Sequence, residues 1–160
     1  MGTSKTATKT TKTVSFYTQK LRLDKVEEPD YMADKVSTSK DAEKIARRFT
    51  DQDTIEIFEC FSVIFLNKAN KPISWAHLSQ GGISGTVADI KLIFAHALLA
   101  GASAIICIHN HPSGNLKPSE ADRDFTKKIK ESGKILDIVL LDHLILTKES
   151  FFSFADEGMI

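Results

Sequence analysis

The sequence contains a short, continuous apolar run from Ala102 to Ile108, bounded by Gly101 and by His109. A strand that is apolar at every position must be covered on both faces of its sheet, so this run predicts a central strand. The run from Ile57 to Leu66 predicts a second buried strand for the same reason. Neither run approaches the roughly 20 apolar residues that span a bilayer. We therefore expect a soluble chain that folds around an interior sheet.

Segments with helical spacing of apolar residues separate the strand-like runs. Helices are predicted over residues 39–50, 89–101 and 119–132, each with a Ser, Thr or Asp at its start that can cap a helix N-terminus. Gly101 and Gly133 are predicted to end the second and third helices. The residues expected to face the core from the second helix are Ile90, Ile93, Phe94, Ala97 and Leu98.

The order of these segments predicts the fold class. A turn at residues 67–71 joins the run 57–66 to a strand over 72–78, which indicates a hairpin, and residues 135–146 form a further strand region. Strands that alternate with helices predict a single-domain α/β fold with a mixed central β-sheet flanked by helices.

The first residues differ in composition from the rest of the chain. Residues 1–13 are mostly Thr, Lys and Ser, which predicts a disordered tail, followed by a strand and loop over 14–35 and one folded domain over 36–160. No apolar segment typical of a signal peptide is present there, so a cytoplasmic protein is expected. Lys and Arg number 21, as do Asp and Glu, and the resulting zero net charge disfavours a nucleic-acid or membrane partner.

The segment HNHPSGNLKPSEAD, residues 109–122, carries the candidate metal ligands. His109 and His111 are two positions apart on a strand and therefore share one face. Pro118 and Ser119 can start a helix whose first turn brings Asp122 back towards the histidines. Two imidazoles and one carboxylate are zinc ligands, and three protein ligands leave one position open, which is typical of catalytic rather than structural zinc.

Simpler interpretations exist for each of these residues taken alone. Ser119 and Asp122 have the spacing of a helix-capping pair, and His77 and His96 are expected to be surface or satisfied core residues. Only the combination of strand, H-x-H, turn, helix and Asp favours a metal site. A metal-binding (β/α)₈ barrel is excluded because 160 residues are too few for a fold of about 250 residues. The cysteines, which lie in apolar runs and are expected in the core, are Cys60 and Cys107.

The same residues resemble the JAMM motif of MPN-type metalloproteins, in which an H-x-H is followed by S-x-x-D. More narrowly, HNHPSG at residues 109–114 and LDHLIL at 141–146 look like the bacterial RadC family. The resemblance covers about residues 36–160 and implies the MPN/JAMM architecture, which is cytidine-deaminase-like.

The resemblance also implies roles for individual residues. Ser119 would donate a hydrogen bond to a developing oxyanion, and a glutamate at the start of an earlier strand would act as the base. Glu59 is favoured over Glu56 because its run EcFsVIFLN is family-like and because it lies inside the apolar segment, whereas Glu56 is expected to face solvent. Adjacent strand residues point to opposite faces, so we assign His143, next to Asp142, to packing or to support of the site. The Zn²⁺ ligands implied are His109, His111 and Asp122.

These observations favour a zinc-dependent amide hydrolase, and the resemblance implies a peptide or isopeptide bond as its substrate. One alternative is a RadC-type accessory protein associated with DNA repair, which the neutral charge disfavours. Another is a non-catalytic MPN scaffold, although such scaffolds commonly lack the ligands that are present here. The particular substrate and the oligomeric state stay open.

Overall fold

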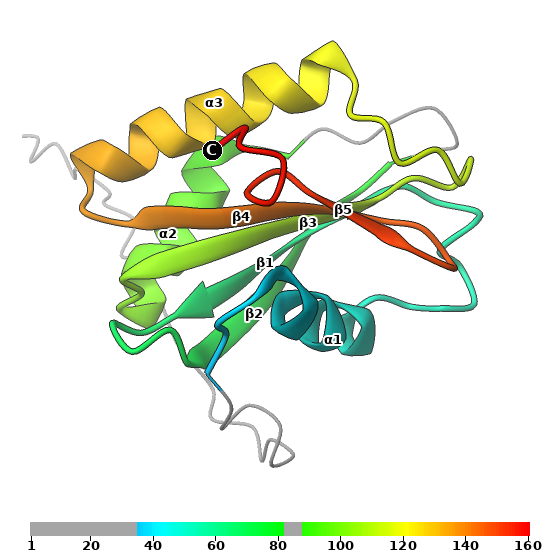
Figure 1. Cartoon of the computed structure of the whole chain (residues 1–160). Coiled ribbons are helices and arrows are strands. Elements are labelled where there is room, and N and C mark those ends of the chain that lie inside the picture. Colours follow the sequence, from blue (N-terminus) through cyan, green and yellow to red (C-terminus); the bar gives the residue numbers. More distant parts are fainter. Residues whose placement is uncertain (1–34, 82–87) are drawn as a thin grey trace, which may run out of the picture.

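The computed structural model describes residues 35–81 and 88–160. These residues form a five-stranded sheet flanked by helices, which confirms the predicted α/β fold with a mixed sheet (Figure 1). The elements, in chain order, are α1 (Ser39–Phe49), β1 (Cys60–Leu66), β2 (Pro72–Gln80), α2 (Ile90–Ala100), β3 (Ala104–Asn110), α3 (Glu120–Ile135), β4 (Val139–Leu146) and β5 (Phe151–Ser153).

The strand order is β2-β1-β3-β4-β5, with β3 in the centre. Every residue of β3 is buried, as its continuous apolar run predicts. The hairpin of β1 and β2 is confirmed, and β1 also pairs antiparallel with β3. β3 and β4 are parallel, and α3 makes the connection between them. The carboxyl ends of both parallel strands therefore lie at one edge of the sheet, where sites in such folds commonly form.

The helices cover the two faces of the sheet separately (Figure 1). α1 packs on one face, and α2 and α3 pack on the other, so the sheet separates two apolar cores. Each strand contributes side chains to both cores, because neighbouring residues of a strand point to opposite faces of the sheet. On β1, for example, Ile64 belongs to the α1 side, whereas Val63 and Phe65 belong to the side of α2 and α3.

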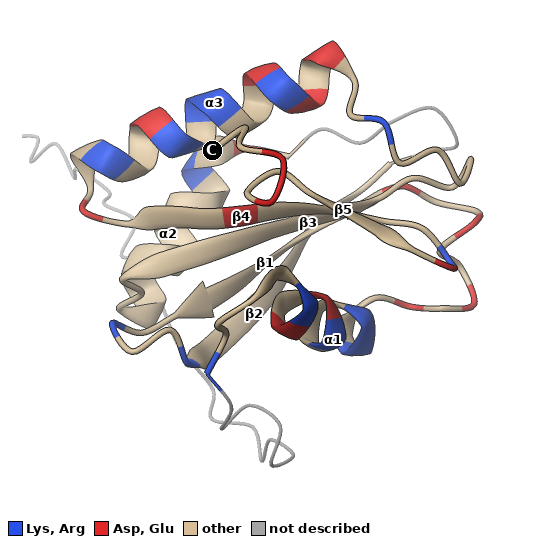
Figure 2. Cartoon of the chain, viewed as in Figure 1, with Lys and Arg blue, Asp and Glu red and all other residues tan. Residues whose placement is uncertain are grey.

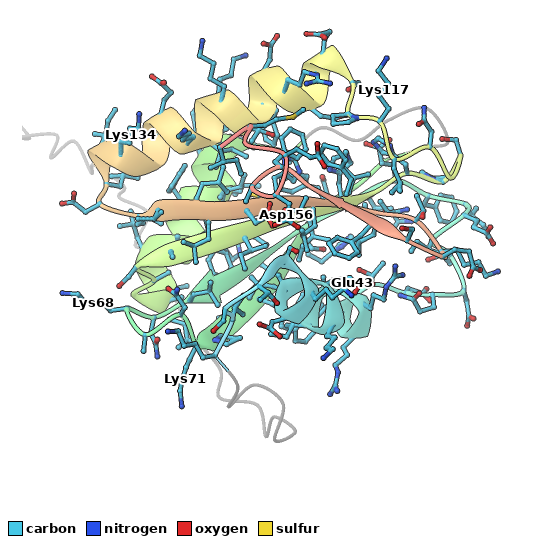
Figure 3. All side chains as sticks on the ribbon, in the orientation of Figure 1. Glu43, Lys68, Lys71, Lys117, Lys134 and Asp156 are labelled. Atoms are coloured by element: carbon cyan, nitrogen blue, oxygen red, sulfur yellow. The ribbon has the colours of Figure 1, made fainter. Side chains whose placement is uncertain are left out.

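Polar contacts join α1 to the C-terminal part of the chain. The Ser39 hydroxyl donates to Asp156 Oδ2 at 2.6 Å, and Asp156 is labelled in Figure 3. The Arg47 guanidinium donates to the carbonyl oxygens of Thr147 and Ser150, each at 3.0 Å. Charged residues gather on the helices and loops, and among the described strands β4 alone carries one, Asp142 (Figure 2).

Two details of the predicted helices are wrong. Gly133 does not end α3, which continues to Ile135. Gly133 is needed for a different reason: a Cβ there would lie 2.3 Å from the carbonyl oxygen of Ile138, so only glycine lets the following segment approach this closely. Leu98 is 59% exposed, because the buried stripe of α2 ends with Ala97 and the next position turns away from the sheet.

The strand predicted to begin at Ile57 begins only at Cys60. Ile57 lies in a turn, with its amide donating to the carbonyl of Thr54 at 2.8 Å, and is 48% exposed. Glu59 therefore lies immediately before β1. The tail predicted over residues 1–13 and nearly all of the strand and loop predicted over 14–35 lie outside the described residues. Within the described part of the chain, no helix is both long and apolar enough to cross a membrane.

Candidate metal centre

The end of β3 presents two histidines on one face of the sheet. The amide of His111 donates to the carbonyl of Leu146 at 2.9 Å, so the pairing with β4 continues one residue beyond the strand and the alternation of side chains is kept. His109 Nε2 and His111 Nε2 are 2.9 Å apart. His109 is buried and His111 is half-buried. The structure thus brings the two imidazoles together as the H-x-H spacing predicts.

Asp122 reaches the histidines from the first turn of α3. Its Oδ1 lies 3.3 Å from His109 Nε2, and its Oδ2 lies 3.7 Å from His111 Nε2. The same carboxylate accepts from the amide of Ser119 at 2.7 Å, while the amide of Asp122 donates to Ser119 Oγ at 3.1 Å. The two interpretations of this pair are therefore compatible, because the capping box holds the carboxylate at the helix N-terminus, beside the histidines.

The donor set of His109, His111 and Asp122 fits a metal ion. His111 Nδ1 lies 2.6 Å from the carbonyl oxygen of Asn115, which can only accept, so Nδ1 carries a proton and leaves the lone pair of the neutral ring on Nε2. Two ring nitrogens 2.9 Å apart beside a carboxylate form a cluster of acceptors that needs a shared cation or proton. One ligand atom from each of the three residues lies within 4.8 Å of the others. This combination of two nitrogens and one oxygen is typical of zinc sites.

The electrostatics of the cluster favour the anionic form of Asp122. Burial alone raises the pKa of this carboxyl, but the neighbouring imidazoles of His109 and His111 and the hydrogen bond from Ser119 outweigh burial and hold the pKa well below its usual range. The nearby Asp122 carboxylate is also the largest cause that raises the pKa of His111. Asp122 is therefore available as a charged ligand throughout the neutral range.

A cavity of about 350 Å³ opens beside the candidate ligands. Its lining includes His109, Asp122 and Glu59, together with the rings of Phe61 and Phe125, which meet edge to face at 5.5 Å. Glu59 is half-buried. A cavity of this size lies within the range of ligand sites, and it combines apolar walls with a few convergent polar groups.

Three of the sequence candidates do not line this cavity: His111, Glu56 and Ser119. Glu56 is exposed and accepts from Lys148 Nζ at 2.9 Å. Ser119 is exposed, and its hydroxyl proton goes to Asp122 Oδ2 at 2.6 Å. Of the two glutamates, Glu59 is thus the one that lines the cavity together with His109, and the Ser119 hydroxyl donates to the carboxylate of the candidate ligand.

Asn110, the middle residue of H-x-H, has a structural role that the sequence did not reveal. It points to the opposite face of the sheet, as alternation requires, where its Oδ1 accepts from the amide of Cys60 at 2.8 Å. Its Nδ2 donates to the carbonyls of Ile55 and Phe58 at 2.7 and 2.8 Å. Asn110 therefore fixes the backbone of the segment that carries Glu59.

His143 contacts the candidate site from β4. Its Nε2 lies 2.9 Å from His109 Nδ1, and its Nδ1 lies 2.7 Å from Thr126 Oγ1 on α3. Burial lowers the pKa of His143 well below its usual value. The neighbouring Asp142 points the other way, where its Oδ2 accepts from the Ser153 hydroxyl at 2.6 Å. The opposite orientation of this pair agrees with the prediction that His143 packs against or supports the site, while Thr126 was not among the sequence candidates.

Comparison with known proteins agrees with this architecture. The sequence model described as the RadC-like JAB domain matches residues 36–159, nearly all of the described chain. The chain belongs to the RadC-like JAB domain family. The match includes the complete His-His-Asp group, so the RadC-like domain of this chain carries a JAMM-type candidate metal site.

Relatives in the family come from several bacteria. A UPF0758 protein of Flavobacterium johnsoniae is 50% identical over 125 residues, which are 78% of this chain and 53% of that protein. A UPF0758 protein of Porphyromonas gingivalis is 46% identical over 99 residues, 61% of this chain and 44% of that protein. UPF0758 protein XAC3915 of Xanthomonas axonopodis pv. citri is 38% identical over 120 residues, which are 75% of this chain and 53% of that protein. This RadC-like chain thus spans about half the length of the curated relatives it matches.

Proposed function

We propose that this RadC-like domain is a zinc-dependent hydrolase that cleaves an amide bond. The observation that carries the proposal is the convergence of His109 Nε2, His111 Nε2 and the Asp122 carboxylate beside a cavity that His109, Asp122 and Glu59 line. These three residues would hold the ion. When bound, zinc in such a site supplies a Lewis acid that polarises a carbonyl group and lowers the pKa of a water to about 7.

Glu59 is proposed as the general base. It is the glutamate that lines the cavity. Asn110 holds the backbone on both sides of Glu59, through the carbonyl of Phe58 and the amide of Cys60. In the proposed reaction, Glu59 takes a proton from the attacking water and returns it to the leaving amine. Glu56, which pairs with Lys148 at the surface, is the alternative base that this proposal rejects.

Ser119 is proposed as the donor to the oxyanion that develops on the substrate carbonyl. A hydroxyl has one proton, and in Ser119 it is given to Asp122 Oδ2, so this role requires the hydroxyl to turn from the carboxylate. Donors of this kind commonly contribute about 10²- to 10³-fold to turnover.

A peptide or isopeptide is proposed as the substrate, because MPN relatives act on such bonds and the cavity suits a peptide segment. Its walls offer two aromatic rings, Phe61 and Phe125, for an apolar side chain, and Asp124 and Lys128 provide charges of both signs. An extended chain with mixed side chains would find apolar and polar contacts there.

The first experiment tests the metal and the base together. Purified wild-type protein should contain about one zinc per chain, measured by elemental analysis, and should cleave members of a quenched fluorescent library of peptide and lysine-linked isopeptide bonds. Glu59→Gln should keep the zinc and lose about 10²- to 10⁴-fold in turnover. Glu56→Gln is the matched control and should keep both zinc and activity.

The metal site, the choice of base and the accessory role in DNA repair each have their own outcome in this experiment. Folded wild-type protein that binds no zinc would refute the metal site, and activity lost in Glu56→Gln but kept in Glu59→Gln would reverse the choice of base. Zinc without cleavage of any library member, together with salt-sensitive binding to DNA that survives removal of residues 1–13, would favour the accessory role in DNA repair.

A further inference from the structure

We infer that His143 and Thr126 form a hydrogen-bonded relay that holds His109 in its metal-binding tautomer and connects it to the backbone of Asp122 on α3. The relay consists of three contacts: His109 Nδ1 to His143 Nε2 at 2.9 Å, His143 Nδ1 to Thr126 Oγ1 at 2.7 Å, and Thr126 Oγ1 to the Asp122 carbonyl oxygen at 2.6 Å. The inference rests on the proposed metal site, and it gives two residues outside that site a positioning role.

The direction of each hydrogen bond follows from the end of the relay. The backbone carbonyl of Asp122 can only accept, so the Thr126 hydroxyl donates its proton there. Thr126 Oγ1 must then accept from His143 Nδ1, which uses the single N–H of a neutral imidazole. His143 Nε2 is left as an acceptor and receives the proton of His109 Nδ1. His109 Nε2 consequently keeps its lone pair, which points to His111 and Asp122.

The surroundings of His143 prevent the ring from changing this pattern. The ring is 1% exposed, stacks on Phe154 with centroids 4.9 Å apart and meets the edge of Phe61 at 5.7 Å. Phe154 is itself held in place, because its amide donates to the carbonyl of His143 at 3.0 Å.

The relay joins the elements that carry the ligands. His109 lies on β3, His143 on β4, and Thr126 and Asp122 on α3. A histidine that binds a metal through Nε2 requires a proton on Nδ1, and the group that accepts this proton sets both the tautomer and the ring orientation. Loss of such a supporting partner typically lowers metal affinity by about 10- to 100-fold.

Thr126→Val tests the relay with little change in shape, because valine replaces the hydroxyl by a methyl group. We expect the zinc dissociation constant, measured by chelator competition, to rise about 10- to 100-fold in Thr126→Val, whereas Thr126→Ser should stay near the wild-type value because it keeps the hydroxyl. If His143→Leu folds, it should lose at least as much zinc affinity as Thr126→Val. If it does not fold, Thr126→Val still tests the relay.

Thr50→Val is the matched control. Thr50 Oγ1 donates to the carbonyl of Ala46 at 2.9 Å, four residues earlier on α1, as Thr126 Oγ1 does to the carbonyl of Asp122 on α3. Among the described residues, no hydrogen bond joins Thr50 to a histidine. Thr50→Val should lose the same hydrogen bond from a threonine hydroxyl to a helix carbonyl, and its zinc affinity should equal that of the wild type. Equal zinc affinities in wild type and Thr126→Val would overturn the relay, as would an equal loss in Thr50→Val.

A second measurement on metal-free protein separates this inference from the proposed function. Side-chain ¹⁵N spectra of the histidines report which ring nitrogen carries the proton, with or without zinc or activity. We expect the proton of His143 on Nδ1 and a proton on His109 Nδ1 in the wild type, with mixed tautomers in Thr126→Val. A proton on His143 Nε2 in the wild type would overturn the relay, whereas the expected spectrum in a protein that binds no zinc would refute only the metal site.

Discussion

Two helices of this protein begin with the same local structure, and only one of them lies at the candidate site. On α1 the cap is Thr38, and Asp41 is the third helical residue; on α3 these positions are Ser119 and Asp122. In both, the capping hydroxyl accepts from the amide of the Asp, at 3.2 Å on α1 and 3.1 Å on α3. In both, the Asp Oδ2 accepts from the amide of the cap, at 2.9 and 2.7 Å.

The difference lies in what each carboxylate faces. The carboxylate of Asp41 receives its closest donors from the backbone amides of Ser37 and Thr38, at 3.1 and 2.9 Å. The carboxylate of Asp122 also meets two imidazoles brought by β3. A capping box therefore orients a carboxylate at a helix start, and the strand beside it decides whether the carboxylate can also bind a metal.

The largest expected difference between the two boxes is in metal binding. Asp122→Asn keeps the size of the side chain and an oxygen that can accept from the amide of Ser119, but it removes the negative charge of the carboxylate ligand. We expect zinc affinity to fall by more than about 100-fold, beyond what loss of a supporting partner costs. Asp41→Asn is the matched control and should bind zinc as the wild type does. Chelator competition on both variants measures the difference, and equal affinities would show that the two carboxylates are equivalent.

The sequence predicts which of the two capping boxes lies beside metal ligands better than it predicts the contacts that surround the site. H-x-H at the end of an apolar run places His109 and His111 on one face, and the short connection to a helix start at Ser119 is sufficient to bring Asp122 back. These are local relationships along the chain, and the structure brings the three residues together. No histidine pair precedes the box on α1, and the sequence offers no metal ligands beside it.

The remainder of the site depends on contacts between distant segments. His143 contacts His109 because β4 is parallel to β3 with Cys107 opposite His143, and no local pattern specifies that register. Thr126 reaches the same ring from α3. Asn110 holds residues 55–60 only because that segment forms a turn rather than the start of a strand. The sequence predicts a helix end at Gly133, because the close approach of Ile138 that requires a glycine there is not visible in it.

A smaller difference is expected when the capping hydroxyls are removed. Thr38→Ala and Ser119→Ala should each lower the free energy of unfolding of the metal-free protein by about 1 kcal/mol, because each removes the same cap. Ser119→Ala should also weaken zinc binding about tenfold, since the hydroxyl orients Asp122, while Thr38→Ala should leave it unchanged. Urea unfolding and chelator competition give the two quantities. Wild-type zinc affinity in Ser119→Ala would show that the backbone amide of Ser119 alone is enough to orient the carboxylate.

The smallest expected effect is the acid sensitivity of the α1 box. Hydrogen bonds from the amide of Ser37 and then from Thr38 lower the pKa of Asp41 below its ordinary value of about 3.9. A carboxyl whose pKa is lower in the folded than in the unfolded state stabilises the fold above the unfolded pKa, and this contribution is lost as the pH falls through the folded pKa. The melting temperature of the wild type should therefore exceed that of Asp41→Asn near pH 6, and the difference should shrink between about pH 4 and pH 2. A difference that stays constant over this range would mean that the charge of Asp41 contributes nothing and that the box on α1 acts only through its neutral hydrogen bonds.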